Sequence, residues 1–245
     1  MNPLDIDRLR RAFPGRRIDY YPRIDSTMRA AARLAPGGVA LADEQTAGQG
    51  RLGRSWHSEP GAGIYCSVVL RPMPVLTLAL GLAAQAAILE AAGLQCDLRW
   101  PNDLMLRDKK VGGILVQLSG EKAIAGIGIN VFQTPRGLED VAWALMPAVS
   151  AVMPTSGPRP LIRESILSAL LPAIDRFTNL APPDILRLFT ASSTYAQGRR
   201  VTVQQPDGAI EGVTAGLDPS GFLIVRRDDG TDTLILAGGV RAAGS

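Results

Sequence analysis

The chain has 245 residues, of which 46% are hydrophobic and 20% charged, and its formal net charge is +3. This length accommodates one catalytic domain with a small appendage, and the apolar fraction suffices for a globular core. The charge is mild and spread along the sequence, so it favours a small anionic ligand and argues against a long basic tract for a phosphate backbone.

The sequence shows no sign of export or membrane insertion. Acidic residues interrupt positions 1–8, where a signal peptide needs an apolar core. The most apolar stretch, 76–94, contains polar residues and is rich in alanine, which suits a buried helix better than a membrane span. Cys66 and Cys96 lack metal-site spacing. We therefore expect two reduced, buried thiols in a cytoplasmic protein with no membrane partner.

The first half of the chain alternates strands and helices. A helix is predicted over 26–34, with the side chain of Ser26 or Thr27 capping its N-terminus and a Pro-Gly-Gly run ending it. The periodicity then predicts strands at 39–42, 64–70 and 96–100 and a helix at 76–92.

The second half begins with a predicted hairpin, in which a Gly-Glu-Lys turn separates strands at 113–119 and 123–130. Helices are predicted at 161–179 and 183–192. The pattern is α+β, and we expect a mainly antiparallel sheet with helices packed on one side.

Short β runs follow Tyr195, at 200–204, 209–215, 222–226 and 233–237, separated by turns rich in Pro, Asp and Gly. This spacing predicts a small β-barrel. We therefore expect a catalytic domain at 1–194 and a C-terminal barrel at 195–245.

The loop at 46–56 combines three glycines, two arginines and a tryptophan. Glycines let a backbone approach a phosphate closely, Arg51 and Arg54 can pair with phosphate or carboxylate oxygens, and Trp56 offers a face for a purine. A solvated basic turn is the alternative. The glycine spacing also satisfies the dinucleotide fingerprint, but no helix pattern follows it, which argues against a nicotinamide or flavin site.

Four motifs in order carry a family resemblance. They are the loop Gly-Gln-Gly-Arg-Leu-Gly-Arg at 48–54, Trp-Pro-Asn-Asp at 100–103, Lys-Val-Gly-Gly-Ile-Leu at 110–115 and Gly-Ile-Gly-Ile-Asn at 126–130. Together they resemble the biotin protein ligases. The resemblance implies a catalytic fold like that of class II aminoacyl-tRNA synthetases and biotin ligases, with an SH3-like C-terminal barrel, in the form without an N-terminal DNA-binding domain.

The resemblance also implies a two-step reaction. Biotin is activated by ATP, with Mg²⁺, to biotinyl-5'-AMP, and biotin is then transferred to a lysine of the biotin carboxyl carrier protein of acetyl-CoA carboxylase. No specific DNA is expected as a partner, and a homodimer is left open.

Three residues are predicted to carry the chemistry. Lys110 matches the lysine that bridges the biotin carboxylate and the α-phosphate, and Arg51 matches the loop arginine that contacts the adenylate. Asp103 is either a Mg²⁺ ligand or the group that takes a proton from the incoming lysine, and the sequence does not decide between these roles. Turn capping by Asp103 is the structural alternative.

Further positions match the ligand contacts of the family. Trp56 and Asn130 resemble the residues that hold adenine, and Ser26, Thr27 and Gln45 match the polar contacts to biotin. The glycines of the strands would let a ligand lie flat, or serve close strand packing. The remaining predicted binding residues are Met28, Gly48, Gln49, Gly50, Arg54, Gly113, Gly126 and Gly128.

Two of these positions depart from the family pattern. Gln49 stands where an arginine is more common, and Met28 stands where an asparagine often follows Ser-Thr. His57 has no evident acid–base partner and is interpreted as structural. Two other functions are alternatives: a lipoate–protein ligase, which shares the fold and the acyl-adenylate chemistry, and a nucleic-acid-binding module, which leaves the ordered motifs unexplained.

Overall fold

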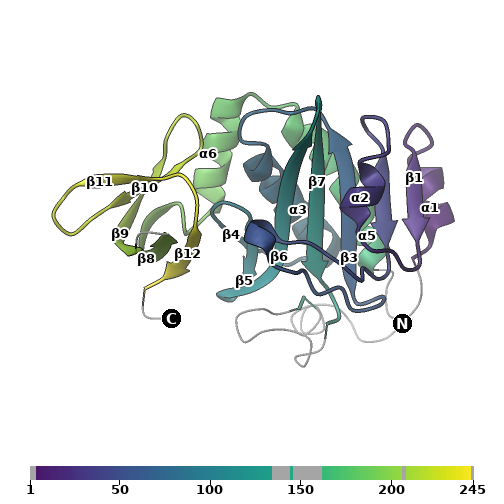
Figure 1. Cartoon of the computed structure of the whole chain (residues 1–245), viewed down its shortest axis with the longest axis horizontal. Helices are drawn as coiled ribbons and strands as arrows, with labels where there is room; N and C mark the ends of the chain where they lie inside the picture. The colour runs from purple at the N-terminus through teal and green to yellow at the C-terminus, as the bar shows by residue number, and fades with distance from the viewer. Residues whose placement is uncertain (1–3, 134–143, 146–161, 206–207, 244–245) are drawn as a thin grey trace.

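The computed structural model describes residues 4–133, 144–145, 162–205 and 208–243. Its larger part is built on a seven-stranded sheet in the order β1-β2-β3-β7-β6-β5-β4 (Figure 1). All neighbours are antiparallel except β1 and β2. The strands are β1 (Ile18–Tyr21), β2 (Val39–Ala42), β3 (Gly63–Leu70), β4 (Asp97–Arg99), β5 (Asp103–Leu106), β6 (Lys109–Ser119) and β7 (Lys122–Asn130).

The sheet separates two layers of helices. Figure 1 shows α3 and α5 behind it and α2, with a short 3-10 turn at Arg51–Gly53, in front. The side chains of β3 alternate accordingly, because Cys66 and Val68 belong to the main core and Val69 packs with α2. The helices are α1 (Ile6–Ala12), α2 (Thr27–Ala31), α3 (Leu76–Ala92), α5 (Ile162–Thr178) and α6 (Pro182–Ser192).

A second sheet follows α6. It is antiparallel, with the order β11-β10-β9-β8-β12, and lies at the left in Figure 1. Its strands are β8 (Gln197–Gln205), β9 (Gly208–Leu217), β10 (Leu223–Arg226), β11 (Asp232–Ile235) and β12 (Gly239–Ala242). The indole N–H of the buried Trp100 donates to the carbonyl of Gly221 at 2.9 Å, which ties this sheet to the first.

The α+β prediction and the small C-terminal β domain are confirmed, the latter with a fifth strand, and one correction concerns the layers. We predicted helices on one side of the sheet, but α2 packs on the other side, where Met28, Ala31 and Leu34 form a small core of their own. The pattern missed α1, β1, β5 and β12, all of which have seven residues or fewer. So few residues give too few repeats for a period to stand out.

The expected boundaries hold best for the longer elements. The predicted helix 76–92 and strand 39–42 have the bounds of α3 and β2. The helix predicted over 26–34 is shorter, and the capping prediction is wrong, since the Ser26 side chain makes no cap hydrogen bond and Thr27 Oγ1 contacts Gln45 and Ser67 instead. Position 161, the predicted start of α5, lies outside the described residues. No helix among the described residues is long and apolar enough to cross a membrane.

Both cysteines are free and buried, as predicted, and burial raises the pKa of each thiol to about 12. At pH 8 the thiolate fraction of each is therefore on the order of one in ten thousand. We expect neither Cys66 nor Cys96 to react with a disulfide reagent in the native protein, and both to react after denaturation. Stoichiometric reaction of the native protein at the rate of free cysteine would contradict the buried placement.

Candidate functional site

The predicted motif residues gather on the face of the sheet that carries α2. Gly113 of β6 pairs with Gly128 of β7, and cross-strand partners point to the same face. Gly126 shares that face, because Ile127 and Ile129, which alternate with the two glycines of β7, belong to the main core on the opposite side. Gly113, Gly126 and Gly128 thus form a floor that has no side chains, which we call the glycine floor.

Two side chains lie on the glycine floor. A Cβ atom at Gly128 would stand 2.5 Å from Cε2 of Trp56, and one at Gly126 would stand 2.8 Å from the sulfur of Met28. A side chain at Gly128 would displace the indole ring, and one at Gly126 would displace the flexible end of Met28. The indole N–H of Trp56 is buried and has no hydrogen-bond partner among the described residues, so it remains available as a donor.

Lys110 reaches this face through a bulge. The pairing of β5 with β6 shifts from Leu104 opposite Gly112 to Met105 opposite Lys110, which leaves one extra residue on β6. Positions three apart on a regular strand point to opposite faces, and the bulge reverses that relation. A Cβ atom at Gly113 would accordingly stand 3.3 Å from Nζ of Lys110.

The carboxylate of Asp103 lies between two cations. Nζ of Lys110 is 2.6 Å from Oδ1, and Nε and Nη2 of Arg99 donate to Oδ2 at 3.2 and 2.7 Å. Burial alone would raise the pKa of Asp103, but the two cations outweigh burial and lower it below its ordinary value. Nζ of Lys110 is also 5.8 Å from the centroid of the Trp56 ring, within the range of a cation–π contact.

A polar cluster forms where β2 leaves the sheet. Oε1 of Gln45 accepts from the backbone N–H of Thr27 at 2.9 Å and from its hydroxyl at 3.0 Å. Nε2 of Gln45 donates to Ser58 at 3.0 Å, and Ser67 lies 2.8 Å from the Thr27 hydroxyl. The hydroxyl of Ser26 is buried and has no partner among the described residues, so it is free to meet a polar ligand group.

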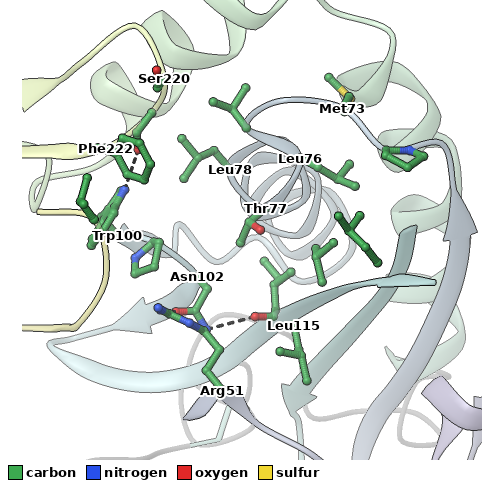
Figure 2. Close-up of a pocket in the computed structure, with 18 residues that line it drawn as sticks. Arg51, Met73, Leu76, Thr77, Leu78, Trp100, Asn102, Leu115, Ser220 and Phe222 are labelled. Carbon is green, nitrogen blue, oxygen red and sulfur yellow. Dashed lines mark hydrogen bonds between the residues drawn. The ribbon is translucent and has the colours of Figure 1, made fainter. Parts of the chain in front are cut away.

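Arg51 stands beside the Trp-Pro-Asn-Asp turn (Figure 2). Its Nη1 donates to Oδ1 of Asn102 at 2.7 Å, and the Asn102 amide donates to the carbonyl of Ile114 at 3.0 Å. Burial lowers the pKa of the Arg51 guanidinium, and the nearby Asp103 acts in the opposite sense. The turn thereby fixes the arginine against β6.

Arg51 borders two cavities. One, of about 410 Å³, is lined mainly by apolar residues of β6, the start of α3 and the loop at 220–222 (Figure 2), and none of Ser26, Gln45 or Lys110 lines it. The other, of about 330 Å³, lies between Leu115 and Gln117 of β6 and the loop residues Gln49, Gly50, Arg51, Leu52, Gly53 and Arg54. Gln49 and Arg54, both exposed, thus face a cavity on the loop side of the sheet.

The remaining predicted residues have mainly structural surroundings. Gly48 is buried, and a Cβ there would stand 2.5 Å from the carbonyl of Trp56. Asn130 is buried at the end of β7, where its backbone carbonyl accepts from Leu145 at 3.0 Å. His57 is exposed. The contacts of Asn130 with adenine therefore stay a prediction.

The hypothesis that Asp103 ligates a metal does not fit these surroundings. Both of its oxygens already face cations, and the described residues contain no group of three or more His, Cys, Asp or Glu side chains that could hold a metal ion. We therefore derive no step from a metal held by Asp103.

Sequence reasoning missed Arg99, Ser58 and Ser67. Arg99 directly precedes the Trp-Pro-Asn-Asp motif, and its spacing of four from Asp103 was the available signal. Ser58 and Ser67 have no such signal in the sequence. They reach the site only through the path of the loop and through the alternation of β3 side chains between the two faces of the sheet.

This chain is similar to protein families and to individual proteins that are named as ligases. Residues 20–133 match the model of the "Biotin/lipoate A/B protein ligase family", and residues 197–240 match the "Biotin protein ligase C terminal domain". A biotin–[acetyl-CoA-carboxylase] ligase of Mycobacterium tuberculosis is 32% identical over 97% of this chain and 94% of its own length. The bifunctional ligase/repressor BirA of Bacillus subtilis is 33% identical over 88% of this chain and 71% of its own length.

Solved structures of biotin protein ligases are also similar to this chain. A biotin protein ligase from Aquifex aeolicus, in complex with biotin and ATP, superposes with a TM-score of 0.77 at 29% identity, covering 93% of this chain and 99% of that one. A Leishmania major biotin protein ligase with biotinyl-5-AMP gives a TM-score of 0.62 at 25% identity, covering 90% and 99%.

The contact of Trp56 with the glycine floor is testable by substitution. Gly128→Ala places a methyl group 2.5 Å from the ring, so the indole must move, and such overpacking costs about 1–3 kcal/mol. We expect a lower free energy of unfolding and a shifted tryptophan emission. Gly239→Ala, in strand β12, is the control for a backbone effect, because nothing lies within 4 Å of its Cβ. Unchanged emission in Gly128→Ala would show that the ring does not rest there.

Proposed function

Because the chain belongs to the biotin protein ligases, we propose that the face with the glycine floor is the site where biotin reacts with ATP and is then passed to a protein lysine. The observation that carries the proposal is the position of Lys110. Its ammonium lies beside the Trp56 ring and above Gly113, so one cation can reach both a nucleotide stacked on the indole and a carboxylate that enters on the same face of the sheet.

In the first step a carboxylate oxygen of biotin attacks the α-phosphorus of ATP, and pyrophosphate leaves. Both reactants are anions, so a cation aimed at them lowers the barrier. Lys110 supplies that charge, and Arg51, held by Asn102, supplies a second one at the loop. The loop at 46–56 closes over the biotinyl-5'-AMP and keeps water from it.

The polar cluster is assigned to the biotin head. A ureido group needs donors and acceptors fixed in an otherwise apolar slot. Thr27 and Gln45 are oriented by their mutual hydrogen bonds, and the unpartnered Ser26 hydroxyl gains a partner when the ureido group arrives. Met28 supplies the apolar wall.

In the second step the amine of the acceptor lysine attacks the acyl carbon, and AMP leaves. The amine must first lose a proton, and Asp103 is the carboxylate beside the reacting atoms, since it already binds the ammonium of Lys110. We assign Asp103 to binding the acceptor ammonium and taking its proton, which then passes to solvent, and Mg²⁺ to the phosphates of ATP.

The acceptor is proposed to be the biotin carboxyl carrier protein of acetyl-CoA carboxylase, as the names of the relatives suggest. A cytoplasmic location is consistent with the two free thiols. Lipoate is the less suitable substrate, since ligases similar to this chain are named for biotin. Binding of a specific DNA is not part of the proposal.

Mass spectrometry of the protein incubated with biotin, ATP and Mg²⁺ tests this function. We expect retained biotinyl-5'-AMP, and no adenylate when lipoate replaces biotin. Adenylate formed from lipoate alone would contradict the assignment of substrate.

Replacing Lys110 tests the first step. Lys110→Ala should lower the rate of biotin-dependent pyrophosphate release by about two to three powers of ten, because the lost cation acts where negative charge accumulates. Lys109→Ala, which removes an exposed ammonium from the adjacent position, is the matched control and should retain the rate. Release by folded Lys110→Ala at the wild-type rate would remove this lysine from the mechanism.

A further inference from the structure

Asp103 binds the ammonium of Lys110 that is proposed to contact the biotin carboxylate and the α-phosphate. Nζ of this lysine lies 2.6 Å from Oδ1, in a pair whose side chains are 28% and 15% exposed. To bridge a carboxylate and a phosphate, the ammonium must leave this partner or share itself with it. A buried carboxylate that loses its only cation is strongly unfavourable, because its desolvation is then uncompensated.

A second cation on the same carboxylate changes this balance. Arg99 donates from Nε and Nη2 to Oδ2, whereas Nζ of Lys110 lies 2.6 Å from the other oxygen, Oδ1. The guanidinium is planar and its two donors act together, so it can hold the carboxylate ionised without help. Lys110 can then move while Asp103 keeps a partner.

We propose that Arg99 is a positioning residue that releases Lys110: by holding Oδ2 of Asp103, it lets the ammonium of Lys110 pass from Oδ1 to the reacting carboxylate and phosphate. The inference rests on the proposed function of Lys110 and assigns Arg99 no contact with substrate. It also explains why Oδ1 becomes available to the acceptor ammonium in the second step.

The C-terminal part of the chain braces Arg99. The Arg99 guanidinium lies 6.0 Å from the centroid of the Tyr195 ring, and the Arg199 guanidinium of β8 lies 3.9 Å from the same centroid. The Tyr195 hydroxyl donates to Oδ1 of Asp108 at 3.2 Å, and Nη2 of Arg199 donates to the same oxygen at 2.6 Å. Asp108 lies in the turn between β5 and β6, two residues before Lys110. One junction therefore fixes both Arg99 and the turn that carries the lysine.

A purely structural role for Arg99 makes a different prediction. If Arg99 only stabilised the turn, the effects of replacing Arg99 and Asp103 on the rate would add. If Arg99 releases Lys110, removing the charge of Asp103 should restore the rate of a variant without Arg99, since no carboxylate then retains the ammonium. The two roles separate in a double-mutant cycle.

The experiment measures single-turnover formation of biotinyl-5'-AMP by the full chain. Arg99→Gln should lower the rate by about 10- to 100-fold with little change in the KM values of biotin and ATP, because the chemical step alone is affected. Arg99→Gln with Asp103→Asn should react at least about fivefold faster than Arg99→Gln, whatever the rate of Asp103→Asn itself. Arg99→Lys should recover part of the rate.

Several outcomes overturn the proposal. They are a wild-type rate in Arg99→Gln, a double variant no faster than Arg99→Gln, and a loss in Arg99→Gln that appears only in KM. Thermal unfolding of each variant identifies misfolded protein, and in that case Arg99→Lys, which keeps the charge, carries the comparison with Asp103→Asn. If wild-type protein forms no adenylate, the proposed function itself fails, which is a separate result.

Discussion

The site depends on one carboxylate that two cations share. Asp103 can ionise while only 15% exposed because Lys110 and Arg99 each take one of its oxygens. This arrangement requires a turn after β4, which returns Asp103 to Arg99, and a bulge in β6, which brings Lys110 to the same face. The turn and the bulge thus each bring one charged side chain to the ion pair.

The sequence predicts those elements whose pattern is long or repeated. The helix Leu76–Ala92 is apolar on nearly every face, as expected of a buried helix, and its bounds follow from the composition alone. The Ser26 cap fails for a physical reason. Gln45, eighteen positions away, takes the backbone N–H of Thr27, and no local pattern contains that partner.

The candidate site could be predicted in part. From residue type and order the motifs predict Lys110, Asp103 and Arg51 as site residues, and the structure places Lys110 beside Asp103. They do not identify Arg99 as a partner of Asp103, because an ion pair across a turn depends on the register of β4 and β5. The departure at Met28 also becomes interpretable only in three dimensions, where its sulfur covers Gly126.

The C-terminal sheet joins the catalytic part through contacts at both ends of the motif that carries the carboxylate. Trp100, within the motif, donates to Gly221, while Tyr195 and Arg199 lie against Arg99 and Asp108. A displacement of this sheet would therefore alter the partners of Asp103 without touching a substrate. On the proposed mechanism, the small sheet would influence catalysis through the geometry of one ion pair, which would give a physical reason for the two parts to be joined in one chain.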